Sequence, residues 1–230
     1  MKQLKILFIL LAVVLATSCN KEEQVTGVGD VLIVAKKSGS DTVYGISLYA
    51  YTFSSFSSVS AVGPSNSHNT YTLKSMNGTF GYETPDSEFS TAKPAAGTYT
   101  FTATFDNGVK QVFDNTLLDA VLPIPTFEKC AYNKLTQQLE VKWQLLNGAT
   151  SYAINILDGS KIVFASQPLR NVTSPSFAIR STPGGWAQNY VPEDGKTYTV
   201  RLFAYMYEPN GGSYNVQCVS MADSNMVWGN

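Results

Sequence analysis

Short runs of alternating apolar and polar residues recur along the chain, and they predict β-strands. In the second half, Leu139, Val141 and Trp143 alternate with polar residues, which gives a strand one buried and one solvated face. Further strands of the same kind are predicted at 152–156, 162–164, 176–179, 198–204 and 214–218. Asn-Gly, Asp-Gly and Gly-Gly pairs between these runs are typical of turns, so we expect an antiparallel β-sandwich in this half.

The first half shows the same organisation. Its predicted strands lie at 31–35, 43–53, 71–75, 79–82, 98–105 and 109–113. Asn77-Gly78 and Asn107-Gly108 separate neighbouring runs and are turn signals for hairpins. The segment 54–69 is rich in Ser, Gly and Pro, and we expect a long exposed loop there. The pattern indicates a second antiparallel sandwich, with an immunoglobulin-like topology.

The segment Leu122-Pro123-Ile124-Pro125 predicts a stiff, extended connection, and we place a domain boundary there. The expected fold is therefore all-β, with two tandem antiparallel β-sandwich domains at 26–125 and 126–230. Their lengths agree with the roughly 100 residues of an ordinary β-sandwich.

Residues 1–18 have the features of a secretory signal peptide. Lys2 and Lys5 precede an apolar run at 6–15, which is too short for a comfortable membrane span. The small residues before Cys19 resemble the lipobox of bacterial lipoproteins, although the leucine stands one place further upstream than usual. This resemblance implies cleavage before Cys19 and a diacylglycerol on its sulfur, with several acyl chains holding the protein to a membrane. The alternative is a secreted protein in which Cys19 is incidental.

Residues 19–25 are expected to form the lipidated tether. Within it, Lys21-Glu22-Glu23 resembles the surface-export signal of lipoproteins from Bacteroidota-type Gram-negative bacteria. The resemblance implies an outer-membrane protein that faces the extracellular medium. The alternative is a charged, solvated tether without a targeting role.

Charge and composition restrict the class of partner. Of the 16 basic residues two leave with the leader, so 14 positive and 17 negative side chains give the mature chain a net charge of −3. This balance does not favour nucleic acid. Charged residues make up 14% of the chain against about 25% in typical soluble proteins, and Ser, Thr, Tyr and Gly are plentiful. Such a composition is typical of extracellular β-proteins.

The second half resembles a fibronectin type III domain at three positions. Trp143 lies where that family has its strand-B core tryptophan, and Tyr152 matches the strand-C tyrosine. The run Gly195-Lys196-Thr197-Tyr198 resembles the start of strand F. The resemblance implies a tyrosine corner, in which the Tyr198 hydroxyl bonds to backbone a few residues upstream. It also implies a scaffold and partner-binding module without catalytic residues. The segment 181–194 is longer than the family pattern, which makes it a place for function.

Cys130 and Cys218 remain once Cys19 is set aside. In an oxidising compartment they either form a disulfide or stay as two buried free thiols. Spacing in the sequence does not decide between these alternatives.

The ligand-binding candidates are Trp186, Asn189 and Tyr190, which share one predicted loop. Exposed aromatic faces suit the apolar faces of sugar rings, and an amide can bond their hydroxyls. Alternatively, the loop folds Trp186 back over the end of the sandwich as a hydrophobic lid. Tyr205, Tyr207 and Tyr214 form either a second aromatic surface or ordinary cross-strand pairs.

The sequence offers few candidates for catalytic residues. His68 is the single histidine, and it stands in a Ser/Asn-rich segment without a nucleophile motif. Asp86 with Glu88, and Glu193 with Asp194, could supply the two carboxylates of a glycosidase, but adjacent turn acids are far more common as exposed turn formers. We therefore predict no catalytic residues, no metal site and no cofactor. The expected function is non-catalytic glycan binding or an accessory role in polysaccharide uptake; the alternative is an adhesive module that binds an envelope protein.

Overall fold

The computed structural model describes residues 26–65, 67, 69–76, 78–182, 184–209 and 215–230. These residues form strands and one short 3-10 helix, and they include no α-helix, so the all-β prediction is confirmed. The first half contains β1 (Gly27–Ser38), β2 (Asp41–Thr52), β3 (Phe56–Val62), β4 (Thr70–Met76), β5 (Thr79–Glu83), η1 (Asp86–Glu88), β6 (Gly97–Phe105) and β7 (Lys110–Leu117). The second half contains β8 (Phe127–Asn133), β9 (Gln138–Trp143), β10 (Ser151–Asp158), β11 (Lys161–Ala165), β12 (Leu169–Arg170), β13 (Ser176–Ile179), β14 (Thr197–Tyr207) and β15 (Val216–Val227). No helix in these ranges is long and apolar enough to cross a membrane.

The predicted strands are all present, but the expected loop at 54–69 is wrong in its first half, where β3 lies. Val59 and Ala61 of β3 point into the core and are almost fully buried. Serines occupy most of the other positions, so the strand has a weak apolar signal. Burial of two small apolar side chains between β4 and β6 overrides the loop-like composition.

One long sheet runs through both halves of the chain in the order β11-β10-β14-β15-β1-β2-β5-β4-β3-β6-β7, with β12 beside β10. Its central joint is a parallel pair, in which Ile33 to Ala35 of β1 lie beside Cys218 to Ser220 of β15. The expectation of purely antiparallel sheets is corrected at this joint. The two halves therefore share a continuous sheet, while the predicted division at residue 125 stays a prediction.

A smaller sheet, in the order β13-β9-β8, packs on the second half of the long sheet. Trp143 of β9 is fully buried, and its ring lies 5.3 Å from that of Tyr152 on β10. Tyr132 of β8 contacts Trp228, which is buried just beyond β15. These aromatic side chains fill the space between the two sheets, as the alternation of residues 139–144 predicts for Trp143.

In the first half the sheet curls until β7 returns to β1. The backbone N–H of Gly27 donates to Gln111 Oε1 at 2.8 Å, and that of Val31 donates to Asn115 Oδ1 at 3.2 Å. A Cβ added at Gly29 would lie 2.6 Å from the Phe101 ring, so this close approach requires glycine. Side-chain amides thus replace a backbone ladder between these two strands.

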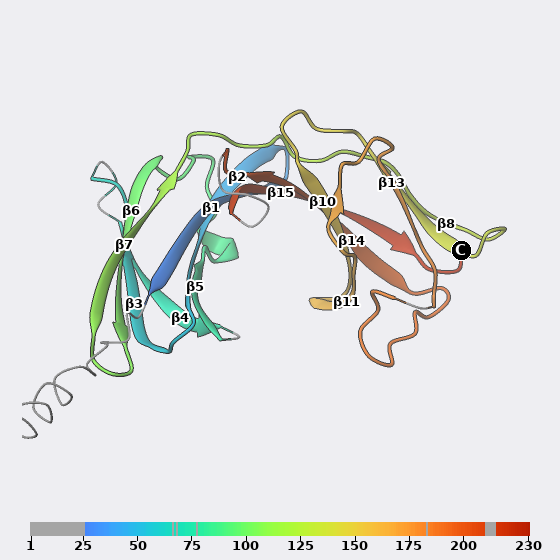
Figure 1. Cartoon of the computed structure of the whole chain (residues 1–230). Helices are drawn as coiled ribbons and strands as arrows, with labels where there is room; N and C mark the ends of the chain where they lie inside the picture. Colours follow the sequence, from blue (N-terminus) through green and yellow to red (C-terminus); the bar gives the residue numbers. More distant parts are fainter. Residues whose placement is uncertain (1–25, 66, 68, 77, 183, 210–214) are drawn as a thin grey trace, which may run out of the picture.

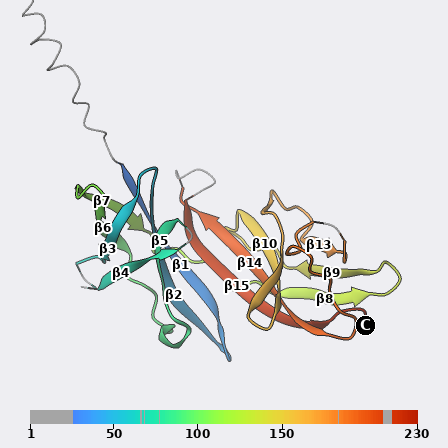
Figure 2. The ribbon, with the colours of Figure 1, turned by 90° about the horizontal axis from the view of Figure 1, so that it is seen from below.

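The molecule has the shape of an arch (Figure 1). Figure 2, which views it from below, shows β14, β15, β1 and β2 side by side in the middle of the arch. The connection between the halves packs along β15: Ser220 Oγ donates to the Pro123 carbonyl at 2.8 Å, and Leu122 N–H points to Cys218 Sγ at 3.4 Å. The proline-rich connection is therefore fixed to the sheet that it crosses.

Candidate functional site

The predicted Trp186 loop folds onto the end of the second half. The Trp186 ring is stacked on Tyr190 at 5.8 Å and meets Phe164 and Trp228 edge to face at 5.2 and 5.4 Å. Its Nε1–H donates to the Arg180 carbonyl at 2.7 Å. Trp186 and Tyr190 are half-buried, so each ring shares its faces with other protein rings. The structure brings these two predicted residues together in the arrangement of a lid.

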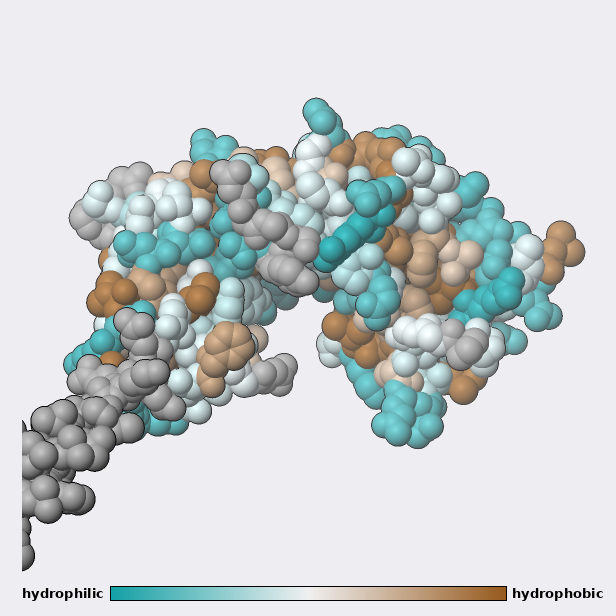
Figure 3. Space-filling model, in the orientation of Figure 1, coloured by the Kyte–Doolittle hydropathy of each residue, from teal (hydrophilic) through white to brown (hydrophobic). Residues whose placement is uncertain are grey.

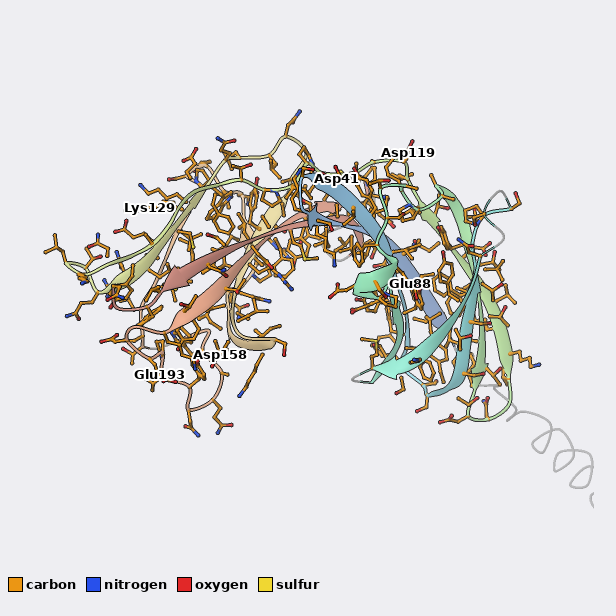
Figure 4. The ribbon with its side chains drawn as sticks, turned by 180° about the vertical axis from the view of Figure 1, so that it is seen from behind. Asp41, Glu88, Asp119, Lys129, Asp158 and Glu193 are labelled. Carbon is orange, nitrogen blue, oxygen red and sulfur yellow. The ribbon has the colours of Figure 1, made fainter. Side chains whose placement is uncertain are left out.

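Tyr190 is also held through its hydroxyl, which donates to Asp158 Oδ2 at 2.9 Å and lies 3.1 Å from the Tyr198 hydroxyl. Burial, followed by the bonds to Tyr198 and Asp158, raises the pKa of Tyr190. Asp158 in turn accepts from Lys196, and this bond is the main reason that the pKa of Asp158 is lowered. Figure 4 shows Asp158 and Glu193 at the same end of the second half.

Tyr198 makes the hydrogen bond that the sequence predicted for it. Its hydroxyl accepts from the backbone N–H of Glu193, five residues upstream, at 3.0 Å. Tyr99 of β6 forms a similar bond in the first half, where its hydroxyl donates to the Ala95 carbonyl at 2.9 Å. Both tyrosines are buried and stand two or three residues after a glycine, near the start of β6 and of β14. A tyrosine thus fixes the entry to one strand in each half.

Asn189 differs from its two neighbours. It is exposed, and its φ of 61° lies in the left-handed region that asparagine tolerates. The structure shows it as a turn residue beside the lid rather than as the edge of an aromatic platform.

The other predicted sites fall into two groups. Cys19, Lys21, Glu22, Glu23, His68 and Tyr214 lie outside the described residues. Cys130 and Cys218 are free thiols on β8 and β15, so the disulfide alternative does not form in this structure. Cys218 is buried beside Leu122, and burial raises its pKa to about 11.

A groove lies under the arch, on the concave face of the long sheet. Its volume is about 810 Å³, within the range of small-molecule sites. Figure 3 shows the hollow between the two lobes. The lining comes from five neighbouring strands, β14, β15, β1, β2 and β5, and from the segment around η1. Because the two halves of the chain join through β1 and β15, this surface forms only when both halves are present.

The floor of the groove is apolar, and it has an aromatic strip. Phe203 and Tyr205 of β14 point away from the buried core residues of the same strand, with ring centroids 6.1 Å apart and planes 27° apart. Val34 of β1 and Met221 of β15 extend this surface next to them. All four side chains are partly exposed, so the groove presents apolar faces to solvent.

Four of the charged side chains of the groove form two ion pairs. Arg201 binds Asp223 with two bonds of 2.8 Å, which raises the pKa of Arg201. Lys36 pairs with Asp86 and lies over the Phe89 ring at 3.8 Å. With Lys37 and Glu83, the lining has three cationic and three anionic side chains, so its net charge is zero. The groove has no electrostatic preference for a charged ligand.

Tyr49 and Asp30 lie opposite each other at one end of the same face. The Tyr49 hydroxyl donates to Glu83 Oε1 at 2.7 Å, and burial with that bond raises the pKa of Tyr49. The backbone N–H groups of Val31 and Val216 lie near the Asp30 carboxylate and act to lower its pKa, so this carboxylate lies between the two halves of the chain. Burial, and then the nearby charge of Glu208, raises the pKa of Asp30 to about 6. Its Oδ1 is buried and has no hydrogen-bond partner among the described residues.

The groove was not among the sites that the sequence predicted. Tyr205 was named only as part of a tyrosine cluster, and Phe203, Tyr49 and Arg201 were not named. A signal was present, because Arg201, Phe203 and Tyr205 are the outward residues of a strand whose inward residues are all apolar. That signal shows a surface strip but not that two halves of the chain fold it into a concave face.

No family model matches the chain, and no curated protein matches it in sequence. Among solved structures, the chain is similar to the BSP domain of a biofilm associated protein, with 11% identity, a TM-score of 0.27, and coverage of 95% of this chain and 54% of that one. It is also similar to a β-1,2-glucanase from Parabacteroides distasonis, with 11% identity, a TM-score of 0.28, and coverage of 87% and 37%. Trypsin-activated alpha-2-macroglobulin from Escherichia coli matches with 10% identity, a TM-score of 0.24, and coverage of 88% and 16%. The chain thus spans about half or less of each of these structures, and TM-scores this low carry no argument about function.

Proposed function

We propose that this chain is a lipid-anchored protein of the outer membrane that faces the medium and binds glycans without catalysis. Cys19 anchors it through acyl chains, and Lys21-Glu22-Glu23 directs it to the cell surface. The architecture is a pair of β-sandwiches, the second of fibronectin type III type, whose shared sheet forms the binding groove. The ligand is a neutral stretch of polysaccharide.

The observation that carries the proposal is the aromatic strip of Phe203 and Tyr205 on the floor of the groove. Sugar rings have apolar faces that pack on aromatic rings, and their hydroxyls bond to polar groups at the sides of a site. The groove offers both, because Tyr49, Glu83 and Ser47 stand on the face that continues from the strip. The zero net charge of the lining favours a ligand without charge.

The acidic side chains of the groove support binding without hydrolysis. Glycoside hydrolysis needs one carboxylic acid that stays protonated and a second that is ionised. Asp86 and Asp223 are ion-paired, and bonding to Lys36 lowers the pKa of Asp86. Glu83 accepts from Tyr49. None of these three described carboxylates has the apolar surroundings of a general acid.

The test is binding of the chain without its leader to a panel of neutral plant, bacterial and host polysaccharides by affinity electrophoresis. The double variant Phe203→Ala, Tyr205→Ala should lose at least about tenfold in affinity, because stacking faces are removed from the centre of the site. Phe53→Ala is the matched control, since Phe53 is fully exposed and lies outside the groove lining. If a polysaccharide retarded the double variant as strongly as it retards the control, the groove would be ruled out as the site.

The adhesive alternative has one observation of its own. Leu135, in the turn between β8 and β9, is 97% exposed, so it is accessible to a partner at the tip of this hairpin. A partner protein captured at this hairpin tip should be lost in Leu135→Ser and retained in the groove variant. If the glycan proposal is right, polysaccharide binding should be lost in the groove variant and retained in Leu135→Ser.

A further inference from the structure

A second hollow lies on the opposite face of β2 and β5 from the groove. Neighbouring residues of β5 show the division: Glu83 lines the groove, whereas Tyr82, next in the chain, lines the second hollow. The segment around η1 lies between the two, because Asp86 and Phe89 line the groove, Glu88 lines the hollow, and Thr84 lines both. We call this second hollow the tyrosine pocket, after Tyr44, Tyr71 and Tyr82. Its volume is about 580 Å³.

The tyrosine pocket is lined by aromatic rings and by hydroxyl and amide groups. Tyr71 and Tyr82 meet edge to face at 5.0 Å, and both are half-buried. Asn69 Nδ2 donates to the Tyr71 hydroxyl at 3.4 Å, which places this hydroxyl at the pocket wall. Burial, and then the charge of the nearby Glu88 carboxylate, raises the pKa of Tyr82, and Glu88 lies at the end of η1 (Figure 4). Tyrosine rings and their polar ends therefore meet in one small space.

The charges of the tyrosine pocket restrict the ligand further. Among its described lining residues, Lys93 is the one cation, and it pairs with Asp119. An anion would find no unpaired positive charge here. The Glu88 carboxylate is exposed and forms no ion pair with any described cation, so it can accept hydrogen bonds from neighbouring hydroxyls. A neutral ligand with several hydroxyls and one apolar face satisfies these groups together.

We infer that the tyrosine pocket is a second binding site, separate from the groove, that takes a single neutral sugar ring. The choice of a sugar as the ligand rests on the proposed function, whereas the position of the site does not. The groove would hold an extended stretch of chain, and the tyrosine pocket a terminal or branching residue. Bound together on opposite faces of β2 and β5, they would give a branched polysaccharide two contacts with one protein and a higher total affinity.

The experiment uses the chain without its leader and monosaccharides as probes: glucose, galactose, mannose and N-acetylglucosamine, with choline as a cationic probe for the three tyrosines. Binding is measured by saturation-transfer NMR and by titration. At least one of the four sugars should bind. Tyr82→Phe removes a hydroxyl from the pocket, and Glu88→Gln removes the charge of an acceptor there, so each should weaken sugar binding by about tenfold.

Glu140→Gln is the control, because its carboxylate also accepts a side-chain hydrogen bond, from Asn133, and lies outside the linings of both the groove and the tyrosine pocket. It should leave the affinity for the monosaccharide unchanged. The inference would be overturned if Tyr82→Phe and Glu88→Gln left sugar binding unchanged. It would also be overturned if choline were the one probe that bound, or if no probe bound. One result would uphold this site and reject the groove. In that result Tyr82→Phe weakens monosaccharide binding, but the double variant Phe203→Ala, Tyr205→Ala leaves the binding of every polysaccharide unchanged.

Discussion

Ile33 of β1 lies beside Cys218 of β15 in a parallel register, and this pairing joins the first strand of the fold to its last. The same edge of β1 receives the side-chain amides of Gln111 and Asn115 from β7. β1 is therefore shared by both halves. The groove depends on β1, because Val34 and Lys36 lie on the face of this strand opposite Ile33 and form part of the lining.

The joint should depend on Gln217, which is buried and bonds twice to one residue of the connection. Its Oε1 accepts from Leu118 N–H at 3.2 Å, and its Nε2 donates to the Leu118 carbonyl at 3.0 Å. Gln217→Ala leaves both backbone groups without partners, so the free energy of unfolding in urea should fall by about 1–3 kcal/mol. Gln144→Ala, at an exposed position, is the control and should stay within roughly 0.5 kcal/mol of the parent. Equal stability of the two variants would show that the Leu118 bonds do not hold the joint.

The local elements could be predicted because they depend on neighbours in the sequence. Alternation placed β9, β10 and β14, and turn signals placed the hairpins. The β1–β15 pair could not be placed, because register between distant strands leaves no local trace. One indication existed: residues 31–35 are apolar on both faces, as expected for a strand in the middle of a sheet.

The site was harder to predict for a related reason. Trp186 was singled out by its loop position, but the structure packs it against Phe164 and Trp228. Phe203 was overlooked, since an outward aromatic residue on a strand is commonplace. What makes it a candidate is the curvature of a sheet built from both halves, and that curvature is a property of tertiary structure.

Replacing Trp186 should therefore affect stability before it affects binding. Trp186→Ala removes the contacts to three aromatic rings and the bond to the Arg180 carbonyl, so we expect a loss of about 2–4 kcal/mol in unfolding free energy. Gln188→Ala, exposed in the same loop, should change it by less than about 0.5 kcal/mol. Stability that is unchanged in Trp186→Ala, together with loss of polysaccharide binding, would restore the loop as the ligand site.

Asp30 gives the joint a defined pH dependence. Its folded-state pKa of about 6 is above the ordinary value of 3.8, so the folded protein binds the proton more tightly than the unfolded chain does. The resulting stabilisation is fully present below about pH 4 and is lost as pH rises through about 6. Asp30→Asn keeps an acceptor oxygen and removes the charge beside Glu208. It should be more stable than the parent by on the order of 1–2 kcal/mol at pH 7, after allowance for partial solvent exposure.

The measurement for Asp30 is urea unfolding of the parent and of Asp30→Asn at intervals from pH 4 to pH 8. The difference in unfolding free energy should grow between pH 4 and pH 7 and then level off. Asp114→Asn, on the exposed outer face of β7, should show no such trend. A difference that shrinks as pH rises would mean that the Asp30 carboxylate stabilises the joint in its charged form.

The two thiols provide a chemical test of the same joint. Cys218 is buried between β1 and the connection at Leu122, and burial raises its pKa to about 11, while burial also raises the pKa of Cys130. Because the thiolate is the reactive form, neither should react quickly with Ellman's reagent at pH 8 in the folded chain of residues 21–230, which lacks Cys19. In guanidinium chloride both should react at once, giving two thiols per chain, and Cys218→Ala should give one. A native chain that gives none in denaturant, with a mass lower by two hydrogens, would show that Cys130 and Cys218 are bridged and that β8 and β15 are arranged differently from this structure. Rapid labelling of Cys218 in the folded chain would instead show that the β1–β15 joint opens in solution, and the groove with it.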